Sequence, residues 1–498
     1  MNKLLLHLLI LPFLFFLLTP LFYAYPPGWS DDILLTPEDS KSRYSPDVDV
    51  DAYNNIWVVW DSATWINGTG EILYSKRDSL GNCLIPETDV SNNPSYSILS
   101  RIAVDNLNNV HFVWRDETPQ GLGIWYAKFA NDGGVIISSK LAVSGAGGLG
   151  SLIPEIALNK YQELNIIWDE RPLGYNQMNY TKLDSLGDTL IAKIRVSPEN
   201  ISASWPGIGV DSLMNNHLGY RTDSSTVMRL TYTKLDEDGN MLIDNKTIGF
   251  GGQPTLIADH SQNIHVIYSD PTGPGNRVEY LKLDNDGNIL IGPLTISLPQ
   301  INSNTYAHMA IDSLQYLHIV WQADSSADVH IMYAKLDTMG NFIISPMKIV
   351  YPYQGIMPRI AVDRSNRLHV VWVDGRLNPG GDIFYKRGEN EPGVEETAGW
   401  SQPDAFCLEV YPNPFIQMTD IRYEIPDEKH SMKDIELKIY DVTGRLVKNF
   451  SLSTAYSLLP TVVWYGDDDS GRKLPAGVYF VRISNIEYKR TIPVVLLR

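Results

Sequence analysis

A motif that returns seven times constrains this chain more than any other feature. In each copy, an acidic or amide residue ends one apolar run and an aromatic residue follows nine positions later. The seven pairs are Asp51/Trp60, Asp105/Trp114, Asn159/Trp168, Asp211/Tyr220, Asp259/Tyr268, Asp312/Trp321 and Asp363/Trp372. Successive first members are 54, 54, 52, 48, 53 and 51 residues apart. A period near fifty with strand-like content is typical of an array of similar β-units.

Each repeat contains the pattern of four short strands. In the second repeat, apolar and β-branched runs predict strands at 102–104, 110–114, 124–128 and 135–141. Turn residues separate them, with Asp and Asn at 105–109 and Asn-Asp-Gly-Gly at 131–134. Four antiparallel strands per repeat correspond to one blade of a β-propeller. A linear solenoid also fits the period but would need capping repeats.

The two ends of the array favour a closed ring. The seventh repeat has its strand tyrosine, Tyr385, but lacks the turn glycine and the fourth strand that follow in the other repeats. Residues 34–39, before the first repeat, resemble residues 195–200, where a fourth strand ends. We therefore predict that the N-terminal segment completes the last blade and that residues 30–388 form a seven-bladed β-propeller. Such closure hides sheet edges that would otherwise promote aggregation.

The N-terminus has the pattern of an export signal. Lys3 precedes an almost wholly apolar run at 4–18, and Pro20 and Ala24 suit a cleavage region, which predicts a signal peptide at 1–24. An uncleaved membrane anchor is the alternative. No other stretch approaches the ~20 apolar residues that span a bilayer, so we expect no stable transmembrane segment after signal removal. The mature protein is expected to be secreted or attached at the outer surface.

Charge and cysteine content exclude some classes of protein. The formal net charge of −18 argues against nucleic acid as a partner, because phosphate binding requires a cationic face. The chain has only two cysteines, Cys83 and Cys407, in different regions, so no disulfide framework is expected. Packing and sheet hydrogen bonds must hold the fold together.

A second domain follows the array. Residues 389–403 are acidic and contain Pro392 and Pro403, which is typical of a linker. Strand patterns then resume with a different period over 404–498. A segment of about 95 residues with short strands suits a small β-sandwich.

Four motifs in this region occur in a characteristic order. They are Tyr-Pro-Asn-Pro-Phe at 411–415, Ile-Tyr-Asp-Val-Thr-Gly-Arg-Leu-Val at 439–447, Trp-Tyr-Gly at 464–466 and Leu-Pro-Ala-Gly-Val-Tyr-Phe at 474–480. The set resembles the type A C-terminal sorting domain of the bacterial type IX secretion system, a pattern related to the Ig-like domain of flagellar hook-capping proteins. The resemblance implies that residues 404–498 engage the outer-membrane secretion machinery, followed by release or surface attachment. An accessory Ig-like module without a sorting role is the alternative.

Histidines recur six residues after the repeat aspartate. They are His111, His217, His265, His318 and His369. A ring of imidazoles could hold a metal, but equivalent positions of different blades lie on a wide circle, whereas metal ligands must converge within a few ångströms. We therefore predict a structural role for them and expect neither a metal nor a resident cofactor.

An acidic residue follows the second strand of every repeat, and arginines share the same loops. The set is Asp61, Asp116, Asp169, Asp223, Asp270, Asp324 and Asp374, with Arg115, Arg171, Arg221 and Arg376. Loops on a rigid scaffold commonly carry function, and charges of both signs suit a polar ligand such as a glycan or a peptide. Alternatively, each aspartate caps its own loop by accepting backbone hydrogen bonds. The mixed charges make this face the predicted ligand-binding face.

The loop of the first repeat, at 61–70, adds Trp65 to this face. An exposed tryptophan often marks recognition of a sugar or a protein, although this one could equally fold back onto the rim.

Acidic turns such as Asp236-Glu237-Asp238-Gly239-Asn240 are similar to parts of calcium loops. The full twelve-residue loop with its terminal glutamate is missing, which favours an ordinary hairpin turn.

Signals for catalysis are weak. The sequence contains no nucleophile elbow, zinc motif or phosphate-binding glycine loop, and its aspartates are too numerous to single out a catalytic pair. We therefore favour a non-enzymatic binding protein that recognises a glycan or a protein. A carbohydrate-active hydrolase or lyase and a structural envelope protein are the alternatives.

Overall fold

The computed structural model describes most of the chain. The described residues are 28–37, 39, 41–64, 69–93, 96–118, 121–144, 153–172, 174–224, 227–273, 275–299, 301, 303–325, 329–350, 355–389, 407–411, 418–424, 436–442, 445–450, 461–484 and 489–497. All the regular elements in these ranges are β-strands, which confirms the prediction of an all-β chain. Within the same ranges, no helix is both long and apolar enough to span a bilayer.

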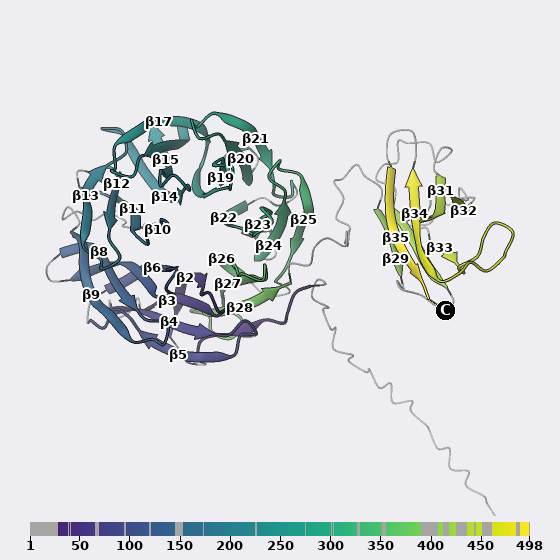
Figure 1. The fold of residues 1–498 in the computed structure, drawn as a ribbon, viewed down its shortest axis with the longest axis horizontal. Helices are drawn as coiled ribbons and strands as arrows, with labels where there is room; N and C mark the ends of the chain where they lie inside the picture. The colour runs from purple at the N-terminus through teal and green to yellow at the C-terminus, as the bar shows by residue number, and fades with distance from the viewer. Residues whose placement is uncertain are drawn as a thin grey trace, which may run out of the picture.

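Among the described residues of 28–389, the strands form seven four-stranded antiparallel units arranged in a propeller-like ring (Figure 1). The first unit is β2 (Arg43–Val50), β3 (Ile56–Thr64), β4 (Thr69–Arg77) and β5 (Cys83–Asp89). The second is β6 (Tyr96–Val104), β7 (Val110–Thr118), β8 (Gly121–Phe129) and β9 (Val135–Ser144). A single parallel pair, Gly70 and Tyr96, joins these two units.

The next three units repeat the same order. The third is β10 (Pro154–Leu158), β11 (Leu164–Glu170), β12 (Gln177–Leu183) and β13 (Thr189–Arg195). The fourth is β14 (Ser202–Val210), β15 (Asn216–Ser224), β16 (Val227–Leu235) and β17 (Met241–Phe250). The fifth is β18 (Gly252–Ala258), β19 (Ile264–Gly273), β20 (Gly275–Leu283) and β21 (Ile289–Thr295).

The last two units bring the chain back to its start. The sixth is β22 (Ser303–Ile311), β23 (Leu317–Asp324), β24 (Val329–Leu336) and β25 (Phe342–Lys348). The seventh is β26 (Gly355–Val362), β27 (Leu368–Asp374), β28 (Asp382–Gly388) and the N-terminal β1 (Ile33–Leu34). In this unit β1 pairs with β28, so that Ile33 lies opposite Tyr385.

Apolar side chains of adjacent units form shared cores. Trp57 and Tyr74 of the first unit pack with Phe112 and Trp114 of the second. Val48 and Trp60 of the first unit also pack with Val371 and Tyr385 of the seventh. Each fully buried large apolar side chain contributes on the order of 1.5–3 kcal/mol. The repeat aromatic residues therefore hold neighbouring units together, including the first and the last.

The repeat aspartate closes the turn between the first two strands of a unit. In the fifth unit, Asp259 Oδ1 accepts hydrogen bonds from the backbone N–H groups of Ser261 (2.8 Å) and Asn263 (2.8 Å). The acidic hairpin turns are built in the same way, since Asp236 Oδ1 accepts from the N–H groups of Asp238 and Asn240. These contacts are typical of ordinary turns, the interpretation that the sequence favoured over calcium loops.

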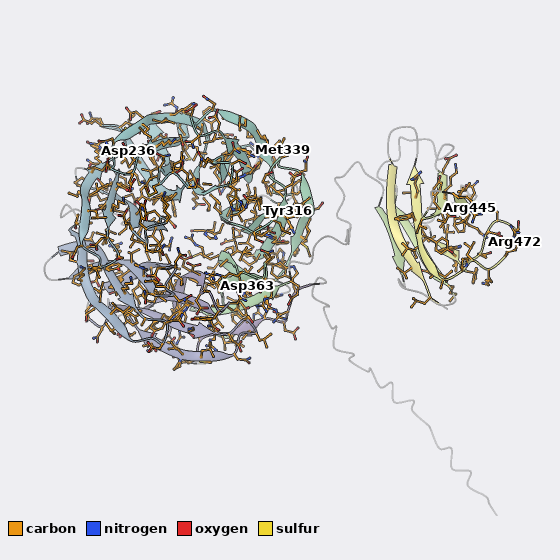
Figure 2. The ribbon with its side chains drawn as sticks, viewed as in Figure 1. Asp236, Tyr316, Met339, Asp363, Arg445 and Arg472 are labelled. Carbon is orange, nitrogen blue, oxygen red and sulfur yellow. The ribbon has the colours of Figure 1, made fainter. Side chains whose placement is uncertain are left out.

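Two turns of the C-terminal region use the same construction with arginine. Arg445 Nε donates to Asp441 Oδ2 at 3.0 Å and Arg472 Nε donates to Asp468 Oδ2 at 2.9 Å (both arginines are labelled in Figure 2).

The strands of this region form two antiparallel sheets. One is β29 (Cys407–Tyr411), β30 (Thr419–Glu424) and β33 (Thr461–Trp464), and the other is β32 (Leu446–Phe450), β31 (Glu436–Asp441), β34 (Gly477–Ser484) and β35 (Lys489–Leu496). Trp464, Ile439 and Val481 are buried in its core.

The recurring histidines lie inside their units and bind residues of the same unit. His265 Nδ1 accepts from the Tyr280 hydroxyl at 2.8 Å, and its Nε2 lies 3.3 Å from Asp259 Oδ2. The same Asp–His–Tyr contacts recur around His111, His217, His318 and His369. Burial lowers the pKa of these histidines, which makes them neutral donors to the aspartate. Both ring nitrogens are thus hydrogen-bonded within the unit at His111, His217, His265 and His318, whereas His369 Nε2 makes a 3.3 Å contact with Asp363 Oδ2 that lacks hydrogen-bond geometry.

We expect the substitution His265→Ala to destabilise the ring by about 1–3 kcal/mol, because it removes the hydrogen-bond acceptor of the buried Tyr280 hydroxyl and one of the donors to Asp259. Urea unfolding followed by tryptophan fluorescence would measure the loss. The control is His260→Ala, an exposed histidine five residues earlier whose removal should change stability by less than about 0.5 kcal/mol. Equal losses for both variants would contradict a structural role for His265.

Candidate functional site

The loop aspartates singled out by the sequence are largely buried. Asp61, Asp116, Asp169, Asp270 and Asp374 are each at most 8% exposed, and Asp223 and Asp324 are half-buried. Trp65 lies outside the described residues. Most of these carboxylates are bound to donors of the protein itself, as the loop-capping alternative describes.

One loop aspartate reaches the first, innermost strand of the next unit, since Asp61 Oδ2 accepts the backbone N–H of Leu99 at 2.9 Å. Two others bind within their own units. Asp169 Oδ1 accepts the backbone N–H of Ile153 at 3.0 Å, and Asp116 Oδ2 accepts from Trp114 Nε1 at 2.9 Å and Ser97 Oγ at 2.8 Å. These aspartates therefore position backbone near the ring axis.

The loop arginines do not converge. Arg376 bridges Asp374 (2.6 Å) and Asp32 (2.7 Å), which ties the seventh unit to the N-terminal segment. Arg221 pairs with Asp223 at 2.7 Å, and Asp270 pairs with Arg277 at 2.7 Å. The remaining loop residues are separate: Arg171 is exposed and donates to Gly174 O, Arg115 is half-buried, and Asp324 accepts from Gln322 Nε2. In the described parts of these loops, the predicted face therefore contains separate ion pairs and no shared cluster of charges.

The innermost strands carry an irregularity that the repeat analysis overlooked. In six units, the pairing between the first two strands shifts by a β-bulge, as between Ile98 and Arg101 or between Ile356 and Arg359. The bulged residue has a positive φ angle at Ser45 (50°), Leu99 (59°), Trp205 (57°), Gln253 (55°), Tyr306 (52°) and Met357 (52°). A non-glycine residue in this region costs about 1–2 kcal/mol, so its recurrence marks a feature that the surrounding fold imposes.

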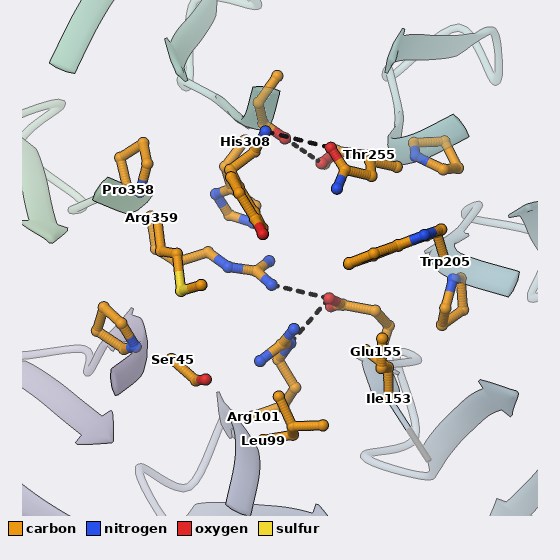
Figure 3. A pocket seen from close by; sticks show the side chains of 17 residues that line it. Ser45, Leu99, Arg101, Ile153, Glu155, Trp205, Thr255, His308, Pro358 and Arg359 are labelled. Carbon is orange, nitrogen blue, oxygen red and sulfur yellow. Dashed lines mark hydrogen bonds and ion pairs between the residues drawn. The ribbon is translucent and has the colours of Figure 1, made fainter. Parts of the chain in front are cut away.

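The bulges surround a cavity of about 160 Å³ on the ring axis (Figure 3). Residues from all seven units line it. We call the bulged residues and their third-unit counterpart the outer ring: Ser45, Leu99, Ile153, Trp205, Gln253, Tyr306 and Met357. Two positions further along each strand lies the inner ring: Asp47, Arg101, Glu155, Gly207, Thr255, His308 and Arg359. Of the inner ring, Asp47 and Gly207 do not line the cavity.

The outer ring is uncharged and partly aromatic. Trp205 and Tyr306 meet edge to face, with ring centroids 6.4 Å apart. Both side chains are half-buried, and both line the cavity. Such rings offer an apolar face to a ligand at low entropic cost, because few side-chain torsions must be fixed.

The inner ring contains a charged bridge. Glu155 Oε1 accepts from Arg101 Nε and from Arg359 Nη2, both at 2.8 Å (dashed lines in Figure 3). Burial opposes ionisation of Glu155, but the two guanidinium charges outweigh it and lower the pKa of the carboxyl to about 2. The same bridge links the second, third and seventh units across the axis.

Other inner-ring side chains bind the backbone of the next unit. Asp47 Oδ2 accepts the N–H of Ile102 at 3.1 Å, and His308 Nδ1 accepts that of Ile360 at 3.2 Å. Burial, together with the charge of Arg359, lowers the pKa of His308 to about 3. At neutral pH the imidazole is therefore uncharged. Burial raises the pKa of the Tyr306 phenol, which is therefore also uncharged.

This arrangement suits binding better than proton transfer. Among the described lining residues, Glu155 is the one carboxylate, and it is held ionised. A general acid or base works best with a pKa near the working pH, whereas Glu155 and His308 are shifted well away from it. In the described part of the chain, no group of three or more His, Cys, Asp or Glu side chains is placed to hold a metal ion.

The signal for these residues was present in the sequence. A proline stands five residues before the repeat Asp or Asn at Pro46, Pro154, Pro206, Pro254 and Pro358. Proline has no N–H to donate, which suits an edge strand facing a channel. The residues on either side of each proline are the outer-ring and inner-ring residues of that unit.

Comparisons with known proteins identify the C-terminal region. Residues 409–496 match the family model of the secretion system C-terminal sorting domain, which confirms the resemblance to the type IX sorting domain. This domain indicates interaction with the type IX secretion machinery and export, followed by secretion or attachment at the cell surface. No curated protein is significantly similar in sequence.

The ring is similar to several solved structures at 9% sequence identity. A protein of unknown function from Dyadobacter fermentans has a TM-score of 0.47, with 73% of this chain and 99% of that one covered. A PL25 ulvan lyase bound to a glucuronate–sulfated rhamnose unit has a TM-score of 0.49, with 71% and 95% covered. A GH93 α-L-arabinofuranosidase of Fusarium graminearum has a TM-score of 0.43, with 72% and 96% covered. At these scores the likeness carries no argument about the chemistry of the cavity.

We expect Glu155→Gln to destabilise the ring by about 1.5–3 kcal/mol at pH 7, because two partly buried guanidinium groups lose their shared charged acceptor. The folded pKa of Glu155 lies below its ordinary value of 4.5, so its contribution is present above pH 4.5 and is lost as the pH falls toward 2. Urea unfolding of wild type and variant at pH 7 and pH 3 would measure both effects. An equal cost at the two pH values would contradict the charged bridge.

Proposed function

We propose that this chain is a secreted or surface-displayed binding protein that recognises a glycan at the axis of its ring. The C-terminal domain directs its export. The observation that carries the proposal is the axial cavity, in which an aromatic pair faces a bridged set of charged side chains. Concave sites with apolar walls and a few fixed polar groups are the usual form of a small-ligand site.

The domain organisation that we propose is the one predicted from the sequence. Residues 1–24 are a signal peptide, 30–388 a closed seven-bladed propeller, 389–403 a linker and 404–498 a C-terminal β-sandwich. Contacts between the innermost strands of successive units, including those of β26 with β2, support closure of the ring. The pairing of β1 with β28 supports completion of the last blade by the N-terminal segment.

The cavity favours binding over hydrolysis. Glycoside hydrolases of the common mechanism use two carboxyl groups, of which one must carry a proton at the working pH. Among the described residues, no second carboxylate lines the cavity beside Glu155. The low pKa of Glu155 prevents it from acting as the acid. A purely structural envelope role does not explain why Trp205 and Tyr306 have a strained backbone and are partly exposed.

The test of function is retention of the purified full-length protein on a panel of polysaccharides and cell-envelope material, with released sugar measured in parallel. We expect retention without release. Trp205→Ala should weaken retention about tenfold or more, since aromatic anchors commonly contribute over 1 kcal/mol to binding.

The matched control is Tyr161→Ala. Tyr161 is an exposed aromatic residue in the turn between β10 and β11, at the opposite end of the strands, and its removal should leave retention unchanged. Release of sugar would show an enzyme and contradict the binding function. Equal effects of Trp205→Ala and Tyr161→Ala would show that the ligand binds outside the cavity.

Export is tested separately by deletion of residues 409–498 in a host that has the type IX machinery. We expect the truncated protein to accumulate inside the outer membrane instead of reaching the surface or the medium, because the matched sorting domain is lost. Cell fractionation with a propeller-specific antibody gives the readout, and Arg364→Gln, an exposed substitution in the ring, is the control. Normal export of the truncated protein would leave the domain as an accessory module.

A further inference from the structure

The axial cavity is cationic, although the protein as a whole is strongly acidic. The formal net charge of the chain is −18, whereas the ionised side chains that line the cavity are Arg101, Arg359 and Glu155. Two positive charges and one negative charge leave the lining with a net charge of +1, which Asp47, outside the lining with its Oδ1 4.0 Å from Arg359 Nε, offsets in part. His308 adds no charge at neutral pH. A cavity of opposite sign to its protein is complementary to an anionic group.

The two guanidinium groups also have hydrogen-bond donors that are available to a ligand. Both use Glu155 Oε1, through Arg101 Nε and Arg359 Nη2, and Arg101 Nη1 donates to the carbonyl of Ser100 at 2.7 Å. Arg101 Nη2 and Arg359 Nη1 have no hydrogen-bond acceptor among the described residues. The other oxygen of the bridge, Glu155 Oε2, likewise has no donor in that set. The cavity therefore offers two charged donors and one charged acceptor to a ligand.

The enclosure of the cavity limits how a polymer can enter it. Innermost strands of all seven units contribute to its wall, so a ligand approaches along the ring axis. The volume of about 160 Å³ is similar to that of an engineered cavity of ~150 Å³ that holds one benzene molecule, so the cavity has room for no more than about one ring. A polysaccharide can thus place one terminal residue in the cavity, whereas a segment from the middle of the chain would need an open groove.

We propose that the cavity binds the terminal residue of an acidic glycan, a sugar ring that carries a carboxylate. The carboxylate lies on the free guanidinium donors of Arg101 and Arg359, the apolar face of the ring lies against Trp205 and Tyr306, and Glu155 accepts a ring hydroxyl. This assignment rests on the proposed glycan-binding function and adds the charge of the ligand and the recognition of a chain end. A carboxylate held by two guanidiniums is bound by charge-assisted hydrogen bonds, about twice as strong as neutral ones.

The experiment compares matched acidic and neutral sugars on the full-length protein by calorimetry. The probes are the methyl glycosides of glucuronate and glucose, of galacturonate and galactose, and of mannuronate and mannose, which differ within each pair only at C6. We expect at least one uronide to bind about tenfold or more tightly than its neutral partner, which corresponds to about 1.4 kcal/mol. Equal affinities within every pair would overturn the assignment.

Variants then locate the discrimination. Arg359→Gln should reduce the difference within the preferred pair to about threefold or less, and Arg359→Lys, which keeps the charge, should retain part of it. Arg364→Gln, an exposed substitution in the turn between β26 and β27, should leave the difference unchanged. Discrimination that survives Arg359→Gln in a folded variant would place the anion elsewhere.

Stoichiometry tests recognition of a chain end. An oligouronide of about ten residues should bind one protein molecule per chain, as the monosaccharide does, whereas several molecules per chain would show binding to internal residues and overturn the end-on mode. N-acetylphenylalanine, a carboxylate on a peptide-like aromatic group, is the remaining probe. Binding of this compound without any uronide would overturn the glycan assignment in favour of a protein terminus.

Failure of this inference is distinguishable from failure of the proposed function. If envelope polysaccharide retains the protein but no uronide is preferred over its neutral partner, the acidic chain end is wrong and glycan binding stands. If no polysaccharide, envelope fraction or monosaccharide binds, both are wrong.

Discussion

The fold depends on how each unit satisfies the turn between its first two strands. The repeat Asp or Asn accepts backbone N–H groups two and four residues later, and in five units its second oxygen also meets a buried histidine. That histidine is held by a tyrosine from the third strand, so one carboxylate connects three strands. Burial opposes the charge of Asp259, but its hydrogen bonds to His265 and Asn263 outweigh the cost and lower its pKa. The turn therefore supplies a fixed hydrogen-bonded anchor at the same place in successive units, provided by an amide at Asn159 in the third unit and by a carboxylate in the others.

With the strands anchored at that end, the opposite ends of the innermost strands can tolerate bulges. An innermost strand has one unpaired edge, and its N–H groups need acceptors. Side chains of the preceding unit supply several of them, as when Asp47 accepts from Ile102 and Gln322 accepts from Met357. In the fourth unit glycine stands at the inner-ring position, because a Cβ at Gly207 would clash with the carbonyl oxygen of Pro254. The residues that close the axis and the residues that line the cavity are thus neighbours on the same strands.

This coupling is the reason why we propose the cavity as the ligand site in place of the predicted loops. A loop aspartate such as Asp61 is buried and accepts the N–H of Leu99, so it shapes the outer ring instead of presenting charge to solvent. The charged side chains that can meet a ligand are those of the inner ring, where Arg101 and Arg359 both bind Glu155. Because most units contribute different side chains at the equivalent positions of the rings, a nearly symmetric scaffold produces an asymmetric site. Export by the C-terminal domain would carry this site to the outside of the cell, where glycans are encountered.

Local pattern was sufficient for the all-β class, the four-stranded repeats and the sorting motif of residues 409–496, because strand periodicity, turn residues and short motifs are encoded by neighbours in the chain. The structural role predicted for the histidines agrees with the contacts of His265, since its partners lie six and fifteen positions away. The approach of Arg101, Glu155 and Arg359 was decided by the tertiary structure alone. Glu155 and Arg359 are 204 residues apart, and they meet because the ring curvature brings seven equivalent strand positions to one axis. No single repeat contains that information, since the site exists only where all seven units face one another.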